Sequence, residues 1–143
     1  TPLYSSAASD VYKRQACIQT IVIAEELFER YRHNTDFIQQ YVFPGGMLPS
    51  RASFRASAAK AGLQVEGEFA FGADYAKTLC LWRDSFNQQL QEVRQLGFDE
   101  AFIRLWNFYL MYCAAGFSER NIDVVQFTLS HDHTRTSSDA LSA

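Results

Sequence analysis

The residues from Tyr41 to Ser50 (YVFPGGMLPS) constrain the fold of this chain more than any other stretch. Pro44 and Pro49 have no backbone N–H to donate, and two glycines lie between them, so no regular helix or strand can run through the segment. The stretch is nevertheless rich in large apolar residues, namely Tyr41, Phe43, Met47 and Leu48. We therefore expect a sharply turned, buried loop that shapes a binding site.

The composition is that of one globular unit. The 143 residues are 48% hydrophobic and 15% aromatic, which is enough to bury one core. The net charge of -3 provides no basic field, so no nucleic-acid partner is expected. No apolar run approaches the roughly 20 residues of a transmembrane segment. Three cysteines without a CxxC pair are interpreted as buried apolar residues in a reducing compartment, the cytoplasm: Cys17, Cys80 and Cys113.

Residues 1–15 differ from the rest of the chain, because polar and small residues alternate there with no period of 2 or 3.6. The letters SSAASDVYKRQ can be encoded by DNA that resembles a transposase-type sequencing adapter read in frame. We interpret residues 1–15 as a non-native, adapter-derived segment and exclude them from the fold. The alternative is a natural polar arm. On the first interpretation the native reading frame is cut at Ala16, and its N-terminal part is missing.

The chain after this segment begins with a strand signal. Residues 16–24 are β-branched and almost uncharged, which is typical of a strand buried on both faces. The charged residues 25–34 predict a loop or one exposed helical turn. Asn34 or Thr35 can then cap a brief helix that ends at the Pro-Gly-Gly turn.

A capped helix and an edge strand follow the loop. Ser50 is a suitable N-cap for a helix over residues 51–61, and Gly62 is suited to end it. Residues 64–71 alternate between apolar and polar side chains, so we expect a half-exposed strand at a sheet edge.

The last third of the chain predicts two helices and a strand. Asp74 and Asp99 can each cap a long amphipathic helix, the first ending at Gly97, and the two helices are expected to pack together. Residues 122–130 are β-branched and aromatic, so they predict a second buried strand. Residues 131–143 form a polar tail. The order is that of an α/β fold, but three strands alone would leave a raw sheet edge, so the chain is interpreted as part of a larger fold.

Few residues carry a chemical signature by themselves. His131 and His133 have no third ligand nearby, so we expect no metal site. Glu25 and Glu26 are interpreted as a solvated face, and no nucleotide-binding glycine motif is present. Tyr75 opens a helix directly after a predicted strand, where ligands of open α/β sheets lie; an aromatic residue at the end of a core helix is an equal alternative.

Four ordered segments carry a family resemblance: FIQQYVFPGGMLPS (37–50), YAKTLCLW (75–82), CAAGF (113–117) and IDVVQF (122–127). They resemble the cyclopropane-fatty-acyl-phospholipid synthases, including the mycolic acid cyclopropane synthases. The resemblance covers residues 16–130. It implies the C-terminal part of a class I S-adenosylmethionine-dependent methyltransferase (Rossmann-like) domain, with three strands of which the last is antiparallel between the other two.

The resemblance also implies a function and site residues. The family transfers a methyl group from S-adenosylmethionine to a cis alkene of a lipid acyl chain, and a bound bicarbonate then takes a proton as the cyclopropane closes. Tyr75 matches a tyrosine that contacts bicarbonate, Ile21 matches an isoleucine whose backbone does so, and Gln19 lies where many members have histidine. The residues implied for substrate binding are Phe43, Leu48, Leu79, Cys113 and Phe117, although the helical ones also suit an ordinary core.

The resemblance places the S-adenosylmethionine site in the missing N-terminal part, so this fragment alone is expected to be inactive. The leading hypothesis is an enzyme that adds a methylene or methyl group to unsaturated phospholipid acyl chains, working in the cytoplasm at the inner face of the membrane. Two alternatives remain. One is the same fold acting on another hydrophobic small molecule, and the other is a non-enzymatic lipid-binding or partner-binding module.

Overall fold

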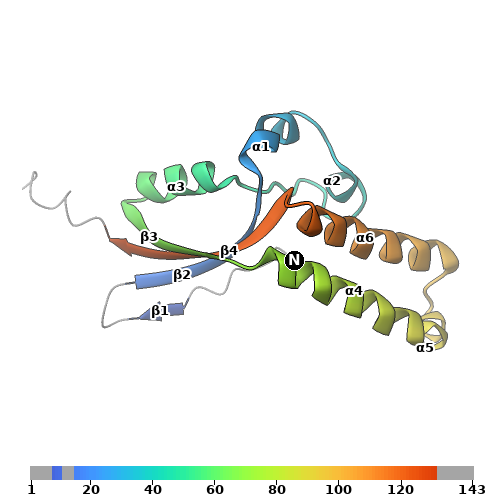
Figure 1. Cartoon of the computed structure of the whole chain (residues 1–143). Coiled ribbons are helices and arrows are strands. Elements are labelled where there is room, and N and C mark those ends of the chain that lie inside the picture. The colour runs from blue at the N-terminus through green and yellow to red at the C-terminus, as the bar shows by residue number, and fades with distance from the viewer. Residues whose placement is uncertain (1–7, 11–14, 132–143) are drawn as a thin grey trace, which may run out of the picture.

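Four strands form one sheet, and six helices connect and cover them, in the part of the chain that the structure describes, residues 8–10 and 15–131 (Figure 1). The structure is a computed structural model. The strands are β1 (Ala8–Asp10), β2 (Gln15–Ile23), β3 (Leu63–Ala70) and β4 (Ile122–His131). The helices are α1 (Glu25–Arg32), α2 (Phe37–Tyr41), α3 (Arg51–Lys60), α4 (Gly72–Gln88), α5 (Leu90–Gln95) and α6 (Glu100–Ser118).

The sheet has the strand order β1-β2-β4-β3. β4 runs antiparallel to β2 on one side and to β3 on the other. The predicted arrangement, in which the last strand lies antiparallel between the two before it, is therefore confirmed, and with the helices it confirms the α/β class. β3 lies at one edge of the sheet, as its alternating sequence predicted.

β1 lies within residues 1–15, which we predict to be adapter-derived. Its backbone pairs antiparallel with Gln15, Ala16 and Cys17 of β2. Residues 1–7, 11–14 and the predicted polar tail from 132 onward lie outside the described residues. The pairing gives β1 a position in the sheet and says nothing of its origin. The predicted segments 1–15, 16–130 and 131–143 thus remain predictions.

β2 is less buried than its sequence predicted. Only Val22 and Ile23 are buried, and residues 15–21 are half-buried. The prediction of a strand buried on both faces is therefore wrong for the described residues. The reason is that β1 lies beside β2 only at residues 15–17, while the rest of that strand edge has no neighbour among the described strands.

The two faces of the sheet are covered by different helices. On one face, α3 packs Phe54 and Ala58 onto Phe127, with the Phe54 and Phe127 rings stacked at 4.0 Å. On the other face, α4 and α6 pack together and onto Val124, as the predicted helix pair required. The apolar residues buried on the α3 face are Val22, Ala58, Val125, Phe127 and Leu129. Those buried on the α4/α6 face are Ala76, Leu79, Leu110, Cys113, Ala114, Phe117 and Val124.

The helix starts follow the sequence where the cap is local. The Ser50 hydroxyl accepts from the Ser53 N–H, and Asp99 accepts from Phe102 N–H at 2.8 Å, so both predicted caps are confirmed. The cap of α2 is Asp36 rather than Asn34 or Thr35, because only Asp36 forms the reciprocal bonds with its third helical residue.

The predicted cap Asp74 is wrong, since α4 starts two residues before it. Phe71 precedes the first turn, and the Gly72 N–H donates at 2.8 Å to the Asp123 carboxylate. A side chain from a distant strand therefore does what a local cap would do. The long helix predicted up to Gly97 is divided into α4 and α5, with the break at Gln89, whose φ of -108° and ψ of 19° are not helical.

The Pro-Gly-Gly loop turns sharply, but it is not buried. Tyr41 is 61% exposed, Phe43 40% and Met47 54%, so the predicted buried loop is wrong over most of its length. Only its end is fixed to the sheet, where the Ile23 N–H donates to the Pro49 carbonyl at 2.9 Å. The charged residues before it form α1, a full helix with no buried residue, rather than a loop or single turn.

Candidate functional site

Three polar side chains meet on the α4/α6 face of the sheet. Gln19 of β2 and Gln126 of β4 are paired across the two strands. The Gln126 Nε2 donates to Gln19 Oε1 at 3.0 Å, and the Gln19 Nε2 donates to the Tyr75 hydroxyl at 3.2 Å. All three side chains are half-buried. The strand register and the first turn of α4 thus bring together Gln19 and Tyr75, which are 56 residues apart.

Aromatic rings surround the Tyr75 side chain. The Phe71 ring lies 5.7 Å from it in an edge-on orientation, and the Phe117 ring lies at 5.4 Å. Phe71 in turn stacks on Phe69 of β3 at 5.6 Å. Such ring faces can attract a cation. The site therefore combines a hydroxyl and two amides with aromatic faces.

Ile21, the third residue expected at the base site, lies two positions along β2 from Gln19, so its side chain is on the same face. It pairs with Val124 and packs against the apolar cluster that includes Tyr75. Its carbonyl accepts from the Thr20 hydroxyl at 3.2 Å. Gln19, Ile21 and Tyr75 thus lie on one side of the sheet.

The residues expected to bind substrate are divided between the core and a cavity. Leu79 and Phe117 are buried in the apolar cluster between α4, α6 and the sheet, and neither residue lines the cavity that holds Leu48 and Cys113. Leu48 and Cys113 line a cavity of about 580 Å³ between α1, α2 and α6. Phe43 lies at the exposed loop, its ring 6.2 Å from that of Tyr109.

The cavity wall is mostly apolar. It is formed by side chains that include Ile23, Leu27, Tyr31, Ile38, Leu48, Tyr112, Cys113 and Ile122. The Tyr31 hydroxyl accepts from the Leu48 N–H at 3.2 Å, which attaches the end of the loop to α1. Because Cys113 also packs in the cluster that holds Tyr75, one continuous apolar region connects the cavity with the three polar residues.

Burial favours the neutral forms of Cys113, which lines the cavity, and of Tyr109. Burial raises the pKa of the Cys113 thiol to about 11, and Asp36 adds to the effect while Tyr109 opposes it. Burial, followed by the adjacent Cys113, raises the pKa of the Tyr109 hydroxyl to about 12. Of the three cysteines predicted to be buried, only Cys113 is; Cys17 is half-buried and Cys80 is exposed. The prediction is wrong for Cys80, which lies on the outer side of α4.

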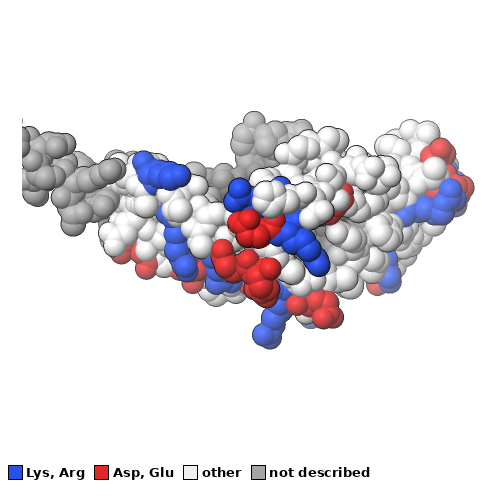
Figure 2. Space-filling view, turned by 90° about the horizontal axis from the view of Figure 1, so that it is seen from above, with Lys and Arg blue, Asp and Glu red and all other residues white. Residues whose placement is uncertain are grey.

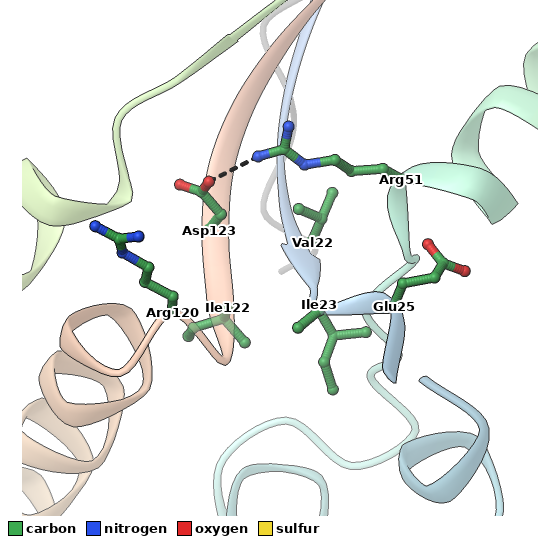
Figure 3. A pocket seen from close by; sticks show the side chains of 8 residues that line it. Val22, Ile23, Glu25, Arg51, Arg120, Ile122 and Asp123 are labelled. Carbon is green, nitrogen blue, oxygen red and sulfur yellow. Dashed lines mark hydrogen bonds and ion pairs between the residues drawn. The ribbon is translucent and has the colours of Figure 1, made fainter. Parts of the chain in front are cut away.

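A charged cluster lies on the α3 side of the sheet, beside a second cavity that shares Ile23 and Ile122 with the first (Figure 3). Arg51 donates to Asp123 at 2.8 Å, and the same carboxylate accepts from Gly72. Arg51 and Arg55 both pair with Glu68 of β3. The second cavity is the smaller one, at about 270 Å³. Because Asp123 connects the first turns of α3 and α4, we interpret this cluster as the group that orients both helices.

Outside this cluster, Glu25 contacts the start of α3. Glu25 accepts from the Ser50 hydroxyl at 2.8 Å and from the Ala52 N–H at 3.3 Å, so it supports the start of α3. On the face shown in Figure 2, acidic and basic side chains lie next to each other, with no extended field of one sign. His131 ends β4, whereas His133 lies outside the described residues; within the described part no three His, Cys, Asp or Glu residues are grouped to hold a metal.

Sequence reasoning did not identify Gln126. The only feature of the sequence that could have pointed to Gln126 is that it is a polar residue between the apolar Val125 and Phe127 of a predicted strand. That pattern is ordinary for a half-exposed strand. Only the pairing of Gln126 with Gln19 shows that the two amides lie opposite each other.

Solved structures share this architecture. Mycolic acid cyclopropane synthase CmaA1, in a crystal structure complexed with SAH and CTAB, matches with a TM-score of 0.71 and 30% sequence identity, over 80% of this chain and 43% of that chain. The cyclopropane synthase MmaA2 from Mycobacterium tuberculosis matches with a TM-score of 0.69 and 25% identity over the same shares. The fold is therefore that of the S-adenosylmethionine-dependent methyltransferases.

Sequence comparison identifies the family. Residues 3–127 match the family profile described as mycolic acid cyclopropane synthetase. The chain is 41% identical over 113 residues to tuberculostearic acid methyltransferase UfaA1 of Mycobacterium tuberculosis, and 34% identical over 94 residues to the cyclopropane-fatty-acyl-phospholipid synthase of Escherichia coli K12. These matches cover 78% and 66% of this chain. The chain belongs to the mycolic acid cyclopropane synthetase family.

The matched region is a small part of each curated relative. It covers 26% of UfaA1 and 24% of the Escherichia coli synthase, so the chain spans about a quarter of their length. The family match starts at residue 3, inside the segment that we predict to be adapter-derived. Among the described residues, no helix combines the length and the apolar character needed to cross a membrane.

Proposed function

We propose that this chain is part of an enzyme that uses S-adenosylmethionine to add a methylene or a methyl group to the double bond of an unsaturated phospholipid acyl chain. The observation that carries the proposal is the contact of the Gln19 amide with the Tyr75 hydroxyl, among aromatic rings and connected to an apolar cavity. The names of the relatives support the same chemistry, since one is a tuberculostearic acid methyltransferase and another a cyclopropane-fatty-acyl-phospholipid synthase.

The residues present suit this reaction. S-adenosylmethionine supplies the methyl group and a bound bicarbonate supplies a proton acceptor when both are present. Transfer of a methyl cation to an alkene leaves positive charge on the acyl chain, which the rings of Phe71, Tyr75 and Phe117 can stabilise. Tyr75 and Gln19 offer a hydroxyl and an amide that suit a small oxyanion, and the Ile21 backbone is the third proposed contact. We assign no described residue to S-adenosylmethionine, so we propose that this chain alone is inactive.

The cavity is proposed to hold the acyl chain. Its apolar wall, with Leu48 and Cys113, suits hydrocarbon, and burial of hydrocarbon is favourable by about 0.8 kcal/mol per CH₂ group. Phe43, Leu79 and Phe117 are proposed to extend this surface toward Tyr75. The cavity is open to solvent, and Leu48 at the end of the loop lines it, which supports entry of a chain from a membrane surface.

A peripheral location at the inner face of the cytoplasmic membrane is part of the proposal. The loop residues Tyr41, Phe43 and Met47 expose apolar surface close to the cavity. Such a surface suits contact with lipid. Vesicle sedimentation of the chain with and without Phe43→Ser checks this point; equal sedimentation of both would contradict it.

The test of the function uses a chimera in which the matching residues of this chain replace their 113-residue counterpart in UfaA1. With methyl-labelled S-adenosylmethionine and an unsaturated phospholipid, we expect label in the acyl chain, and none with the saturated phospholipid as control. Mass spectrometry of the product distinguishes methylene from methyl addition. A folded chimera that labels no acyl chain would contradict the proposal.

The same experiment decides between the alternatives. An enzyme acting on another hydrophobic small molecule would label a non-lipid product in a crude extract and leave phospholipid unlabelled. A non-enzymatic module would bind the lipid and give no labelled product in either assay. The family membership favours the enzyme, because the two relatives named above are enzymes.

A further inference from the structure

The two glutamines and Tyr75 form a directed chain of hydrogen bonds. Gln126 donates to the oxygen of Gln19, at 3.0 Å, so that the nitrogen of Gln19 is the end that faces the tyrosine. That nitrogen donates to the Tyr75 oxygen at 3.2 Å. A hydroxyl has one proton to donate and two lone pairs that accept. Because one lone pair is occupied by Gln19, the Tyr75 proton remains available for another acceptor.

The direction of this chain depends on residue 126. An amide side chain carries an acceptor at one end and a donor at the other, so whichever end meets Gln126 decides which end meets Tyr75. If Gln19 were turned over, its oxygen would accept the tyrosine proton. The hydroxyl would then have no proton left for a bound ligand.

We propose that Gln126 is a positioning residue, which fixes the orientation of the Gln19 amide and thereby directs the Tyr75 hydroxyl proton toward an oxyanion bound beside it. It touches neither the substrate nor the oxyanion and acts through Gln19. The proposal rests on the proposed function for its consequence in catalysis, whereas the orientation itself is a property of this chain.

The neighbourhood of Gln126 contains few groups that could interfere. By the alternation of the strands, Val124 and Thr128 of β4 and Cys17 of β2 lie on the same face. β3 contributes Phe69, which is paired with Gln126, and α4 contributes Tyr75. The titratable groups on this face are therefore Cys17 and Tyr75, together with Cys113 and Tyr109 of α6, which belong to the same apolar cluster as Tyr75. No Asp, Glu, Lys, Arg or His forms a hydrogen bond or ion pair with either glutamine among the described residues.

A glutamate at position 126 should reverse the direction. In Gln126→Glu at about pH 7.5 the introduced carboxylate only accepts, so the Gln19 nitrogen turns toward it and the Gln19 oxygen meets Tyr75. Below the ordinary glutamate pKa of about 4.3 the carboxyl group carries a proton and can donate as the amide did, which restores the original direction. A merely structural role for Gln126 predicts no such recovery.

The direct readout is NMR of the 143-residue chain with labelled glutamine side-chain amides and tyrosine rings. In the wild type we expect an NOE between the Gln19 amide protons and the Tyr75 ring. It should be lost in Gln126→Glu near neutral pH, return in acid, and be weakened at every pH in Gln126→Met. Thr128→Val, on the same face, should leave it unchanged. A wild-type chain without this NOE, or one that keeps it in all variants, would overturn the proposal.

The second readout is activity in the UfaA1 chimera. We expect Gln126→Glu to lower kcat for methyl transfer about tenfold near neutral pH, with KM for the lipid changed less than about twofold. The loss should shrink as the pH is lowered, whereas that of Gln126→Met should not. An unchanged kcat in Gln126→Glu would overturn the catalytic consequence. If the wild-type chimera transfers no methyl group, the proposed function fails, and the NMR result still decides the role of Gln126.

Discussion

On the α3 face of β4, Val125, Phe127 and Leu129 are almost completely buried against Phe54 and Ala58. On the α4/α6 face, the same strand carries the half-buried Gln126 beside the buried Val124. On the first face these three residues of β4 pack only against apolar side chains, and this packing contributes to stability. The second face keeps polar side chains accessible inside an apolar surrounding, where their hydrogen bonds are strengthened and a bound ion can be held. The two faces therefore divide stability and proposed chemistry between them.

The largest change in stability is expected from the α3 face. Phe127→Ala removes a ring that is fully buried and stacked on Phe54, and such a change costs about 3–5 kcal/mol. The matched control is Phe69→Ala on the neighbouring strand, which is 64% exposed and should cost under about 1 kcal/mol. Urea unfolding measures both. Similar losses of unfolding free energy in the two variants would contradict the claim that the α3 face carries more of the stability.

A smaller loss is expected where the two faces meet at Gly72. A Cβ added there would clash with the Asp123 carboxylate and lie 3.2 Å from the Asp123 Cα, so Gly72→Ala must displace the strand or the helix. We expect a cost of about 1–3 kcal/mol in urea unfolding. Gly67→Ala is the control, since nothing lies within 4 Å of its added Cβ. A Gly72→Ala chain as stable as the control would contradict the close approach of α4 to β4.

Alkaline pH should weaken the α4/α6 face. The folded pKa of Cys113 is raised from 9.0 to about 11, so its stabilising contribution is complete below pH 9.0 and is lost as the pH rises to about 11. Tyr109, raised from 10.0 to about 12, extends the loss upward. Denaturation midpoints between these pH values measure the effect. The slope should be shallower in Cys113→Ala, and an equal slope would contradict the assignment.

The smallest change in the free energy of unfolding is expected at the sheet edge formed by β1. Deleting residues 1–14 removes β1, which pairs with only three residues of β2. If the segment is adapter-derived, we expect the free energy of unfolding to change by less than about 0.5 kcal/mol. A loss of several kcal/mol would contradict its exclusion from the fold.

The sequence predicted best what is decided locally. Ser50 and Asp99 cap their helices through hydrogen bonds to residues three positions further along the chain. The position of β4 between β2 and β3 is not local, and it was predicted from the family resemblance. Asp74 failed as a cap because Asp123, 51 residues from Gly72, supplies the acceptor. The prediction of a buried loop was wrong because it was inferred from the apolar residues of the loop, whereas only the end of the loop is hydrogen-bonded to Ile23 of the sheet.

The candidate site could be predicted in part for the same reason. Gln19, Ile21 and Tyr75 were named from the family resemblance, and the structure places them on one face. The role of Gln126 required the strand register, which one sequence does not supply. Likewise, Leu48 and Cys113 share a cavity wall only because the loop end packs near α6.

The most direct test of the central claim is kcat for methyl transfer in the UfaA1 chimera with Tyr75→Phe. This change removes one oxygen, and we expect kcat to fall about a hundredfold with the unfolding free energy changed by less than about 1 kcal/mol. Tyr41→Phe, on the exposed loop, is the matched control and should keep full activity. Equal activity of the two variants would contradict a catalytic site at Gln19 and Tyr75.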